Sequence, residues 1–180
     1  VYLAHDKELE RPVAIKLLPP RLAGQEEFKL RFLREARKLA RLAHANIVQI
    51  FELGTTEGHT FMAMQLMDGG SLQDLLTEKG RLSPQEAARI GRDAARGLAR
   101  AARDNIIHRD IKPANILLGA DGEVRLGDFG LVKEVGEEGQ PLTQTGVILG
   151  TPHYMAPEQC EGREDIDHRA DLYSLGLVLY

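Results

Sequence analysis

The stretch that decides the fold is Ile106–Leu118, which reads IIHRDIKPANILL. Its two ends are apolar, whereas its middle places a histidine, an arginine, an aspartate and a lysine within five positions, His108–Lys112. A proline and an asparagine follow before the chain becomes apolar again. The pattern fits either a solvated loop between two elements or a loop that contains catalytic residues. The sequence of the rest of the chain is needed to decide between these two interpretations.

The composition is that of a globular protein large enough to bury a core. The chain has 180 residues, of which 43% are hydrophobic and 28% charged, and its formal net charge is −4. This acidic balance argues against nucleic acid as the main partner. No apolar run approaches the ~18 residues that cross a bilayer, and no secretory signal opens the chain. A single cysteine, Cys160, excludes an intrachain disulfide and favours a reducing compartment, so we expect a cytoplasmic location.

The first third of the chain predicts strands and one helix. RPVAIKLLPP, residues 11–20, alternates in character and predicts a strand that ends at Pro19. Residues 26–43 predict a helix whose apolar stripe contains Phe32 and Leu39. Glu35 falls inside this stripe, where a carboxylate needs a cation to offset its desolvation. Two further strands are predicted in residues 47–54 and 59–67.

The remainder of the chain predicts mainly helix. The sequence Ser83-Pro84-Gln85-Glu86 has the capping serine, the early proline and the glutamate that start a helix, which we expect to end near Arg103. A hairpin with the turn GADG is predicted around residues 115–129, and residues 133–152 read as a loop. Strands with one helix, a glycine-rich crossing at 68–70 and then mostly helix predict an α+β protein in two lobes.

Five polar residues are not explained by this local pattern. Lys16 lies in the middle of a strand, Glu35 lies in an apolar stripe, and Asp110, Asn115 and Asp128 flank the hairpin. Each has an ordinary interpretation by itself, such as a solvated strand face or a turn. Their order and spacing along the chain are what favour a shared function.

Together these residues belong to four motifs that occur in order. They are VAIK at 13–16, HRDIKPAN at 108–115, DFG at 128–130 and APE at 156–158. On these motifs the chain resembles the eukaryotic-type (Hanks-type) Ser/Thr protein kinases, and closely their bacterial branch, over essentially its whole length. The resemblance implies a two-lobed protein kinase-like fold, with a small, mostly β N-lobe carrying one helix and a mainly α-helical C-lobe.

The resemblance also implies roles in ATP-dependent phosphoryl transfer to Ser/Thr hydroxyls of proteins. Lys16 would hold the α- and β-phosphates, and Glu35 would pair with Lys16. Asp110 would accept the proton of the substrate hydroxyl, while Asn115 and Asp128 would bind Mg²⁺.

Two further residues complete the implied catalytic set. Lys112 occupies the position that marks Ser/Thr specificity and steadies the γ-phosphate. Thr151 is similar to the threonine that links Asp110 and Lys112 in this family.

The implied adenine and regulatory residues rest on alignment with the family alone. The adenine would lie between Ala14 and Leu117, with Met64 as gatekeeper and the backbone of Gln65 and Met67 as the hinge. His108 and Phe129 would stack with Leu39 and Ile50 in a regulatory column anchored on Asp171, which makes His108 structural. Arg109 would bind a phosphate placed on the loop at Thr143 or Thr145, and this loop phosphorylation would arise from self-association and autophosphorylation.

The chain departs from the family pattern at its ends. The glycine-rich phosphate loop is absent and the final helices are missing, so we expect a fragment: residues 1–67 as an incomplete N-lobe and 68–180 as an incomplete C-lobe. Membrane anchoring of a longer protein with a cytoplasmic kinase domain stays open, although no membrane segment lies within the fragment. Two alternatives also stay open. A pseudokinase scaffold is disfavoured by the presence of Lys16, Asp110, Asn115 and Asp128, and a small-molecule phosphotransferase of kinase-like fold is disfavoured by Lys112 and the APE motif.

Overall fold

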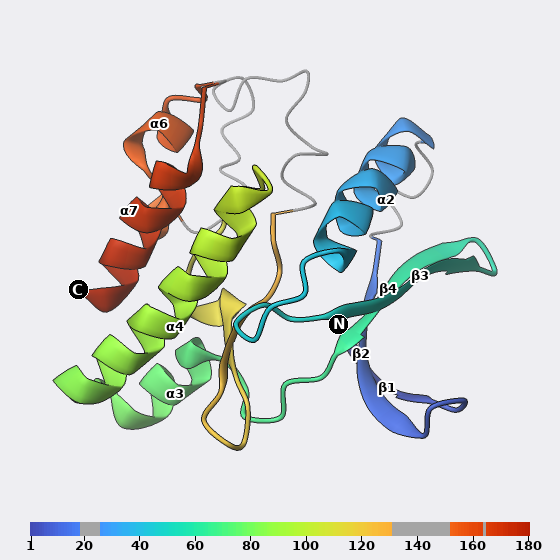
Figure 1. Cartoon of the computed structure of the whole chain (residues 1–180), viewed down its shortest axis with the longest axis horizontal. Coiled ribbons are helices and arrows are strands. Elements are labelled where there is room, and N and C mark those ends of the chain that lie inside the picture. The colour runs from blue at the N-terminus through green and yellow to red at the C-terminus, as the bar shows by residue number, and fades with distance from the viewer. Residues whose placement is uncertain (19–25, 131–151, 164) are drawn as a thin grey trace. The chain divides into compact units, whose positions relative to one another are not determined.

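The chain divides into two compact units, seen in the computed structural model of Figure 1. The structure describes residues 1–18, 26–130, 152–163 and 165–180. Of these, the N-terminal unit contains residues 1–18, 26–44 and 48–66, and the C-terminal unit contains residues 45–47, 67–130, 152–163 and 165–180. Each unit buries apolar side chains of its own.

The N-terminal unit is built on a four-stranded antiparallel sheet in the order β1-β2-β4-β3. Its strands are β1 (Tyr2–Asp6), β2 (Arg11–Leu17), β3 (Ile50–Thr56) and β4 (His59–Gln65). The pairing of β2 with β4 sets Ala14 opposite Met64 and Lys16 opposite Met62. Because side chains alternate between the faces of a strand, this register puts Ala14 and Lys16 on the same face.

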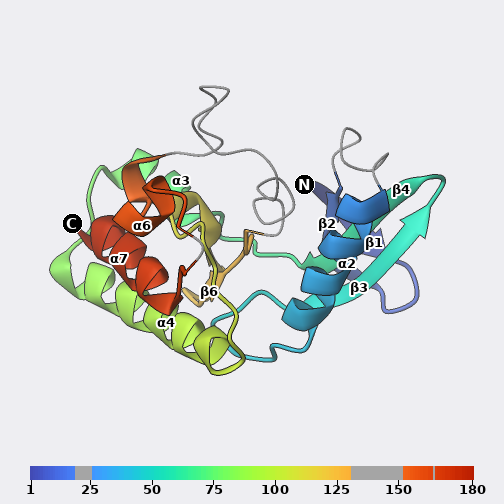
Figure 2. The same cartoon turned by 90° about the horizontal axis from the view of Figure 1, so that it is seen from above.

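Helix α2 (Glu26–Ala40) packs against the sheet of the same unit, as Figure 2 shows. Phe32, Ala36 and Leu39 are buried, at the spacing that places them on one side of a helix. The predicted apolar stripe is thus confirmed at Phe32 and Leu39. The helix ends at Ala40, before the expected residue 43, and the buried Leu42 continues the packing from a turn in which its N–H donates to the carbonyl of Leu39.

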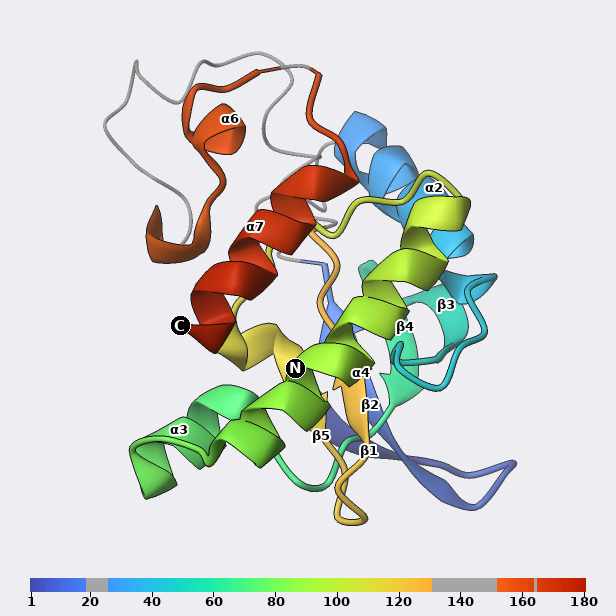
Figure 3. The ribbon, with the colours of Figure 1, turned by 60° about the vertical axis from the view of Figure 1, so that its left-hand side comes forward.

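The C-terminal unit is mainly helical. Its helices are α3 (Leu72–Lys79), α4 (Pro84–Arg103), the short α6 (Pro157–Cys160) and α7 (His168–Leu179). Two short 3₁₀ turns cover Pro113–Asn115 and Pro152–Tyr154, and a small hairpin pairs β5 (Ile116–Leu118) with β6 (Val124–Leu126). Helices α4 and α7 lie side by side in Figure 3, so the helical core forms between them and the hairpin.

Helix α4 begins and ends as its sequence predicts. Ser83 accepts a hydrogen bond from the N–H of Glu86, and the Glu86 carboxylate accepts one from the N–H of Ser83, which completes a capping box. At the other end the helix stops at Arg103, and Asn105 has a φ of 54°, the left-handed conformation expected there. Within the helix, a Cβ on Gly97 would lie 2.6 Å from the carbonyl oxygen of Asn46, so this close approach requires glycine.

Among the helices in residues 1–18, 26–130, 152–163 and 165–180, none is both long enough and apolar enough to cross a bilayer.

Candidate active site

The stretch quoted first, Ile106–Leu118, forms the loop between α4 and the β5–β6 hairpin and then enters β5. The turn Pro113–Asn115 closes this loop, with the N–H of Asn115 donating to the carbonyl of Lys112 at 2.9 Å. Arg109 has a φ of 64°, a conformation that is uncommon for a residue with a side chain. Its N–H donates to the carboxylate of Asp171, 62 positions further along the chain, so a tertiary contact holds this segment.

Asp110, Lys112 and Asn115 meet at one carboxylate oxygen. The Nζ atom of Lys112 lies 2.9 Å from Oδ2 of Asp110, and Nδ2 of Asn115 donates to the same oxygen at 2.9 Å. Nδ2 of Asn115 also donates to the carbonyl oxygen of Asp110 at 2.7 Å. The lysine and asparagine thus orient a carboxylate whose side chain is only 17% exposed. A carboxylate held in this way can accept a proton from a hydroxyl placed beside it.

Asn115 and Asp128 supply oxygens of the kind that Mg²⁺ prefers. Because Nδ2 of Asn115 serves as a donor to Asp110, the remaining Oδ1 atom is an acceptor that suits a hard cation. The N–H of Gly127 donates to the carbonyl of Asn115 at 3.0 Å, which brings the neighbouring Asp128, at a φ of 51°, to the same end of the hairpin.

This donor set fits magnesium bound together with phosphates. The described residues contain no cluster of three or more His, Cys, Asp and Glu side chains that could hold a metal by themselves. Mg²⁺ in phosphoryl-transfer enzymes is instead held by one or two protein oxygens together with substrate phosphates and water. The pair Asn115 and Asp128 matches that requirement.

His108 is buried and is held as a neutral imidazole. Its Nε2 atom lies 2.9 Å from the carbonyl oxygen of Gly127, which can only accept, so Nε2 carries the proton. Its Nδ1 atom then accepts a longer contact, at 3.4 Å, from the N–H of Asp110. Burial lowers the pKa of His108, although Asp171 opposes this effect. The imidazole is therefore already occupied by backbone groups, which supports the expected structural role.

The expected contacts of His108 within the C-terminal unit are present. Its ring lies on that of Phe129 with the two centroids 4.3 Å apart. The carbonyl of His108 accepts from the N–H of Gly130 at 2.9 Å, so the DFG motif is joined to residues His108–Asp110, the HRD segment. The expected extension of this column to Leu39 and Ile50 stays a prediction.

Asp171 anchors the HRD segment from helix α7. One of its carboxylate oxygens accepts from the N–H of His108 and the other from the N–H of Arg109, each at 2.8 Å. Asp171 is only 3% exposed, and burial raises the pKa of its carboxyl group, whereas the two N–H donors oppose that shift. The left-handed Arg109 backbone is thus fixed from a residue 62 positions away in the chain.

Gln159 forms hydrogen bonds to the backbone of the HRD segment and of the APE motif that the sequence patterns did not predict. From α6 its Nε2 atom donates to the carbonyl of Arg109 at 3.1 Å, while its Oε1 atom accepts from the N–H of Ala156 at 3.2 Å. The APE segment is thereby linked to the HRD segment. A glutamine next to APE has no local pattern that would predict this contact.

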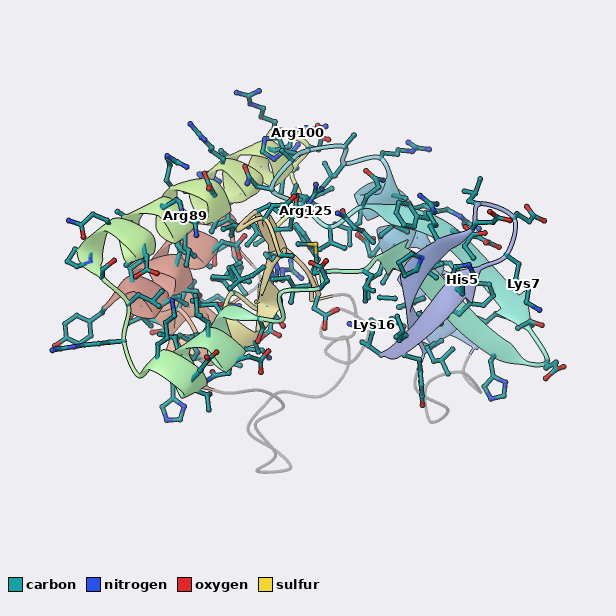
Figure 4. All side chains as sticks on the ribbon, turned by 90° about the horizontal axis from the view of Figure 1, so that it is seen from below. His5, Lys7, Lys16, Arg89, Arg100 and Arg125 are labelled. Carbon is teal, nitrogen blue, oxygen red and sulfur yellow. The ribbon has the colours of Figure 1, made fainter. Side chains whose placement is uncertain are left out.

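In the N-terminal unit, Glu35 does not have the ion pair that the sequence predicted. Among the described residues, the cations paired with its carboxylate are Arg34 and Lys38 of the same helix, at 3.1 and 2.9 Å, and not Lys16. The reason is local, because the i, i+3 position of α2 brings Lys38 to Glu35, and the long side chain of the preceding Arg34 also reaches the carboxylate. Lys16 lies on β2, and Figure 4 shows its side chain extending from that strand.

Three of the expected adenine-binding residues, Ala14, Met64 and Gln65, lie on adjoining strands of the N-terminal unit. Ala14 and Met64 are both buried and face each other across the β2–β4 pair. The N–H of Gln65 donates to the carbonyl of Gln49 at 2.9 Å, so a hinge hydrogen bond from Gln65 would use its carbonyl. Leu117 is half-buried on β5 of the C-terminal unit, and Met67 belongs to the same unit. Thr143, Thr145 and Thr151 lie outside the described residues.

Comparison with known proteins identifies the family. The protein kinase domain family matches residues 1–180. Serine/threonine-protein kinase PknL of Mycobacterium tuberculosis (strain CDC 1551 / Oshkosh) is 44% identical over 180 residues, which cover 100% of this chain and 44% of PknL. Serine/threonine-protein kinase PknB of Mycobacterium tuberculosis (strain ATCC 25177 / H37Ra) is 40% identical over 184 residues, covering 100% of this chain and 29% of PknB.

A solved structure agrees with these sequence matches. The crystal structure of the Mycobacterium tuberculosis PknI kinase domain has a TM-score of 0.78 and 31% identity, over 99% of this chain and 66% of that chain. The chain therefore belongs to the protein kinase domain family, and the expected α+β, kinase-like fold is confirmed. It spans less than half the length of PknL and PknB.

Proposed function

We propose that the protein catalyses ATP-dependent, Mg²⁺-dependent phosphorylation of Ser and Thr hydroxyls on proteins. The observation that carries this proposal is the Asp110 carboxylate held by Lys112 and Asn115. The relatives named serine/threonine-protein kinase support the same reaction. Phosphoryl transfer depends on positioning and charge neutralisation, and this cluster provides both beside an oriented base.

Each residue of the C-terminal cluster has a distinct task in the proposed reaction. The oxygen of the substrate Ser or Thr hydroxyl bonds to the γ-phosphorus of ATP, and Asp110 accepts the hydroxyl proton. The bond between the γ-phosphorus and the β–γ bridging oxygen breaks, which releases ADP. Lys112 is placed beside Asp110 with its Nζ atom 2.9 Å from the carboxylate, where its charge can steady the γ-phosphate. Asn115 and Asp128 would hold Mg²⁺, which would neutralise charge on the phosphates.

The remaining predicted residues complete the proposal. Lys16, on strand β2, would bind the α- and β-phosphates of ATP. Glu35 would form an ion pair with Lys16 in the reactive state. Thr151 would link Asp110 to Lys112. The adenine would be bound by the residues that follow from family alignment: Ala14, Met64, Gln65, Met67 and Leu117.

We also propose residues 1–67 and 68–180 as parts of the two kinase lobes. The substrates would be proteins with Ser or Thr, rather than nucleic acid, and the site would work in the cytoplasm. His108, Phe129 and Asp171 would act as the regulatory column, for which the stacking of His108 on Phe129 gives support.

The reaction can be tested with the full-length protein and radiolabelled ATP. With Mg²⁺ present, label from the γ-phosphate should enter the protein itself or a basic protein substrate, and hydrolysis should return phosphoserine or phosphothreonine. Chelation of Mg²⁺ with EDTA should abolish the labelling, because the phosphates then lose their neutralising charge. Label that is independent of Mg²⁺, or no transfer at all from an intact protein, would contradict the proposed function.

We further propose that one copy phosphorylates the loop of another at Thr143 or Thr145. The new phosphate would pair with Arg109, whose backbone is already fixed by Asp171. Phosphopeptide mapping after incubation with Mg·ATP should find phosphate on one of these threonines, at a rate that rises with protein concentration. A map without phosphate between residues 131 and 151 would remove this part of the proposal.

A further inference from the structure

The Glu35 carboxylate is enclosed by cations of its own helix. Lys38 Nζ lies 2.9 Å from both carboxylate oxygens, and Arg34 Nε lies 3.1 Å from Oε1. The Glu35 side chain is only 14% exposed, whereas Lys38 is 53% and Arg34 68% exposed. The carboxylate is thus the least exposed member of the group, and the side chains of its two cations are mostly in solvent.

This arrangement stabilises Glu35 on α2. A carboxylate with so little exposure loses hydration and has to be compensated by a cation. Lys38 provides that charge from i, i+3 spacing, and its own side chain stays 53% exposed to solvent. The ion pair therefore forms within α2 without a movement of the helix. Lys38 contacts both oxygens and Arg34 contacts Oε1, so these contacts already use three of the roughly four acceptor sites of the carboxylate. A third cation therefore competes for the carboxylate with Lys38 and Arg34.

We propose that Lys38 is a positioning residue for phosphoryl transfer, because it competes with Lys16 for the Glu35 carboxylate. The inference rests on the proposed function, in which Glu35 pairs with Lys16 during the reaction. In the state described by the structure Glu35 is held by Lys38, and in the reactive state it is held by Lys16. The balance between the two ion pairs then sets the fraction of protein that binds ATP productively.

The equilibrium between the Glu35–Lys38 and Glu35–Lys16 ion pairs is expected to shift easily. Ion pairs of partly exposed side chains contribute little to stability, so the gap between the two arrangements is small. Removing the charge of Lys38 should therefore shift the population only several-fold. Arg34 is the weaker competitor, since it contacts one carboxylate oxygen and is the more exposed of the two.

The inference can be tested with Lys38→Met in the full-length protein, which keeps the approximate length of the side chain and removes its charge. The affinity for ATP, measured by titration with a fluorescent ATP analogue, and kcat/KM for ATP should both rise about two- to fivefold. Lys38→Arg keeps the charge and should restore values close to those of the unaltered protein. Arg37→Met removes a neighbouring exposed charge of α2 and is the matched control, which should change neither quantity.

A second pair of variants shows whether the effect acts through Glu35. In a Glu35→Gln background, Lys38→Met should leave the affinity for the ATP analogue unchanged, because no carboxylate remains for the lysines to share. Unchanged or weaker nucleotide binding in Lys38→Met alone, an equal gain in Arg37→Met, or a gain that persists in the Glu35→Gln background would each overturn the inference. The binding titration decides this question even if the protein transfers no phosphate, in which case the proposed function fails separately.

Discussion

Replacing Asp110 by asparagine should lower the rate of phosphoryl transfer by about 10²–10⁴-fold while leaving the fold intact. The carboxylate is oriented by Lys112 and Asn115, both within 2.9 Å of its Oδ2 atom. An asparagine has nearly the same shape, and its side-chain oxygen can still accept from these donors. It cannot, however, take a proton from the substrate hydroxyl. Transfer of labelled γ-phosphate, measured as kcat, should fall, while the affinity for ATP stays within a few-fold of the original.

The matched control for this variant is Asp121→Asn, which makes the same chemical change in the exposed turn between β5 and β6. Its kcat should remain within about twofold of the original, as expected for a surface substitution away from the site. A similar loss in both variants would point to altered folding or charge rather than to the base. Robust transfer by Asp110→Asn would remove Asp110 from its proposed role.

Much of the fold could be predicted because the signals are local. The capping box of Ser83 and Glu86 and the left-handed stop at Asn105 depend on a few neighbouring residues, and both are present. The helical spacing of Phe32 and Leu39 likewise reports burial within one element. In β2, by contrast, the adjacent Val13 and Ala14 are both buried, so its burial does not follow the alternation of the sequence. The predicted end of α2 is less accurate, because burial there does not require helix. Leu42 is buried by tertiary packing although α2 has already ended at Ala40.

The motifs predicted residues that the structure brings together, but only some of the contacts between them. The motifs located Asp110, Lys112 and Asn115, since their order in the chain is distinctive. The two hydrogen bonds of Asp171 and the bond from Gln159 join segments 50 or more positions apart, and no periodicity reports such pairing. Glu35 shows the opposite case: its need for a cation followed from the apolar stripe, but its choice of Lys38 over Lys16 depends on which cation the helix brings nearest.

Replacing Asp171 by asparagine should destabilise the C-terminal unit by about 2–4 kcal/mol, because the N–H groups of His108 and Arg109 each use one oxygen of Asp171 and one of them then loses its acceptor. The amide nitrogen of the new side chain would face one of these donors and leave it unsatisfied. Chemical denaturation of the full-length protein should show this loss as a lower midpoint of the transition that involves this unit. Phosphoryl transfer should also fall under native conditions, since Arg109 at its φ of 64° precedes Asp110 directly.

Asp167→Asn provides the matched comparison on the same helix. Asp167 caps α7 by accepting from the N–H of Arg169 at 2.8 Å, and asparagine caps a helix about as well as aspartate. Asp167→Asn also removes an ion pair with Arg169, but both side chains are exposed and such a pair contributes little. The main difference between the two variants is whether the lost oxygen is buried against two backbone donors, so Asp167→Asn should change stability and activity little. Equal effects would show that the charge of the helix start, rather than the anchoring of the HRD segment, is what Asp171 contributes. A large loss confined to Asp171→Asn is expected, because Asp171 is the carboxylate among the described residues that accepts from the N–H groups of both His108 and Arg109.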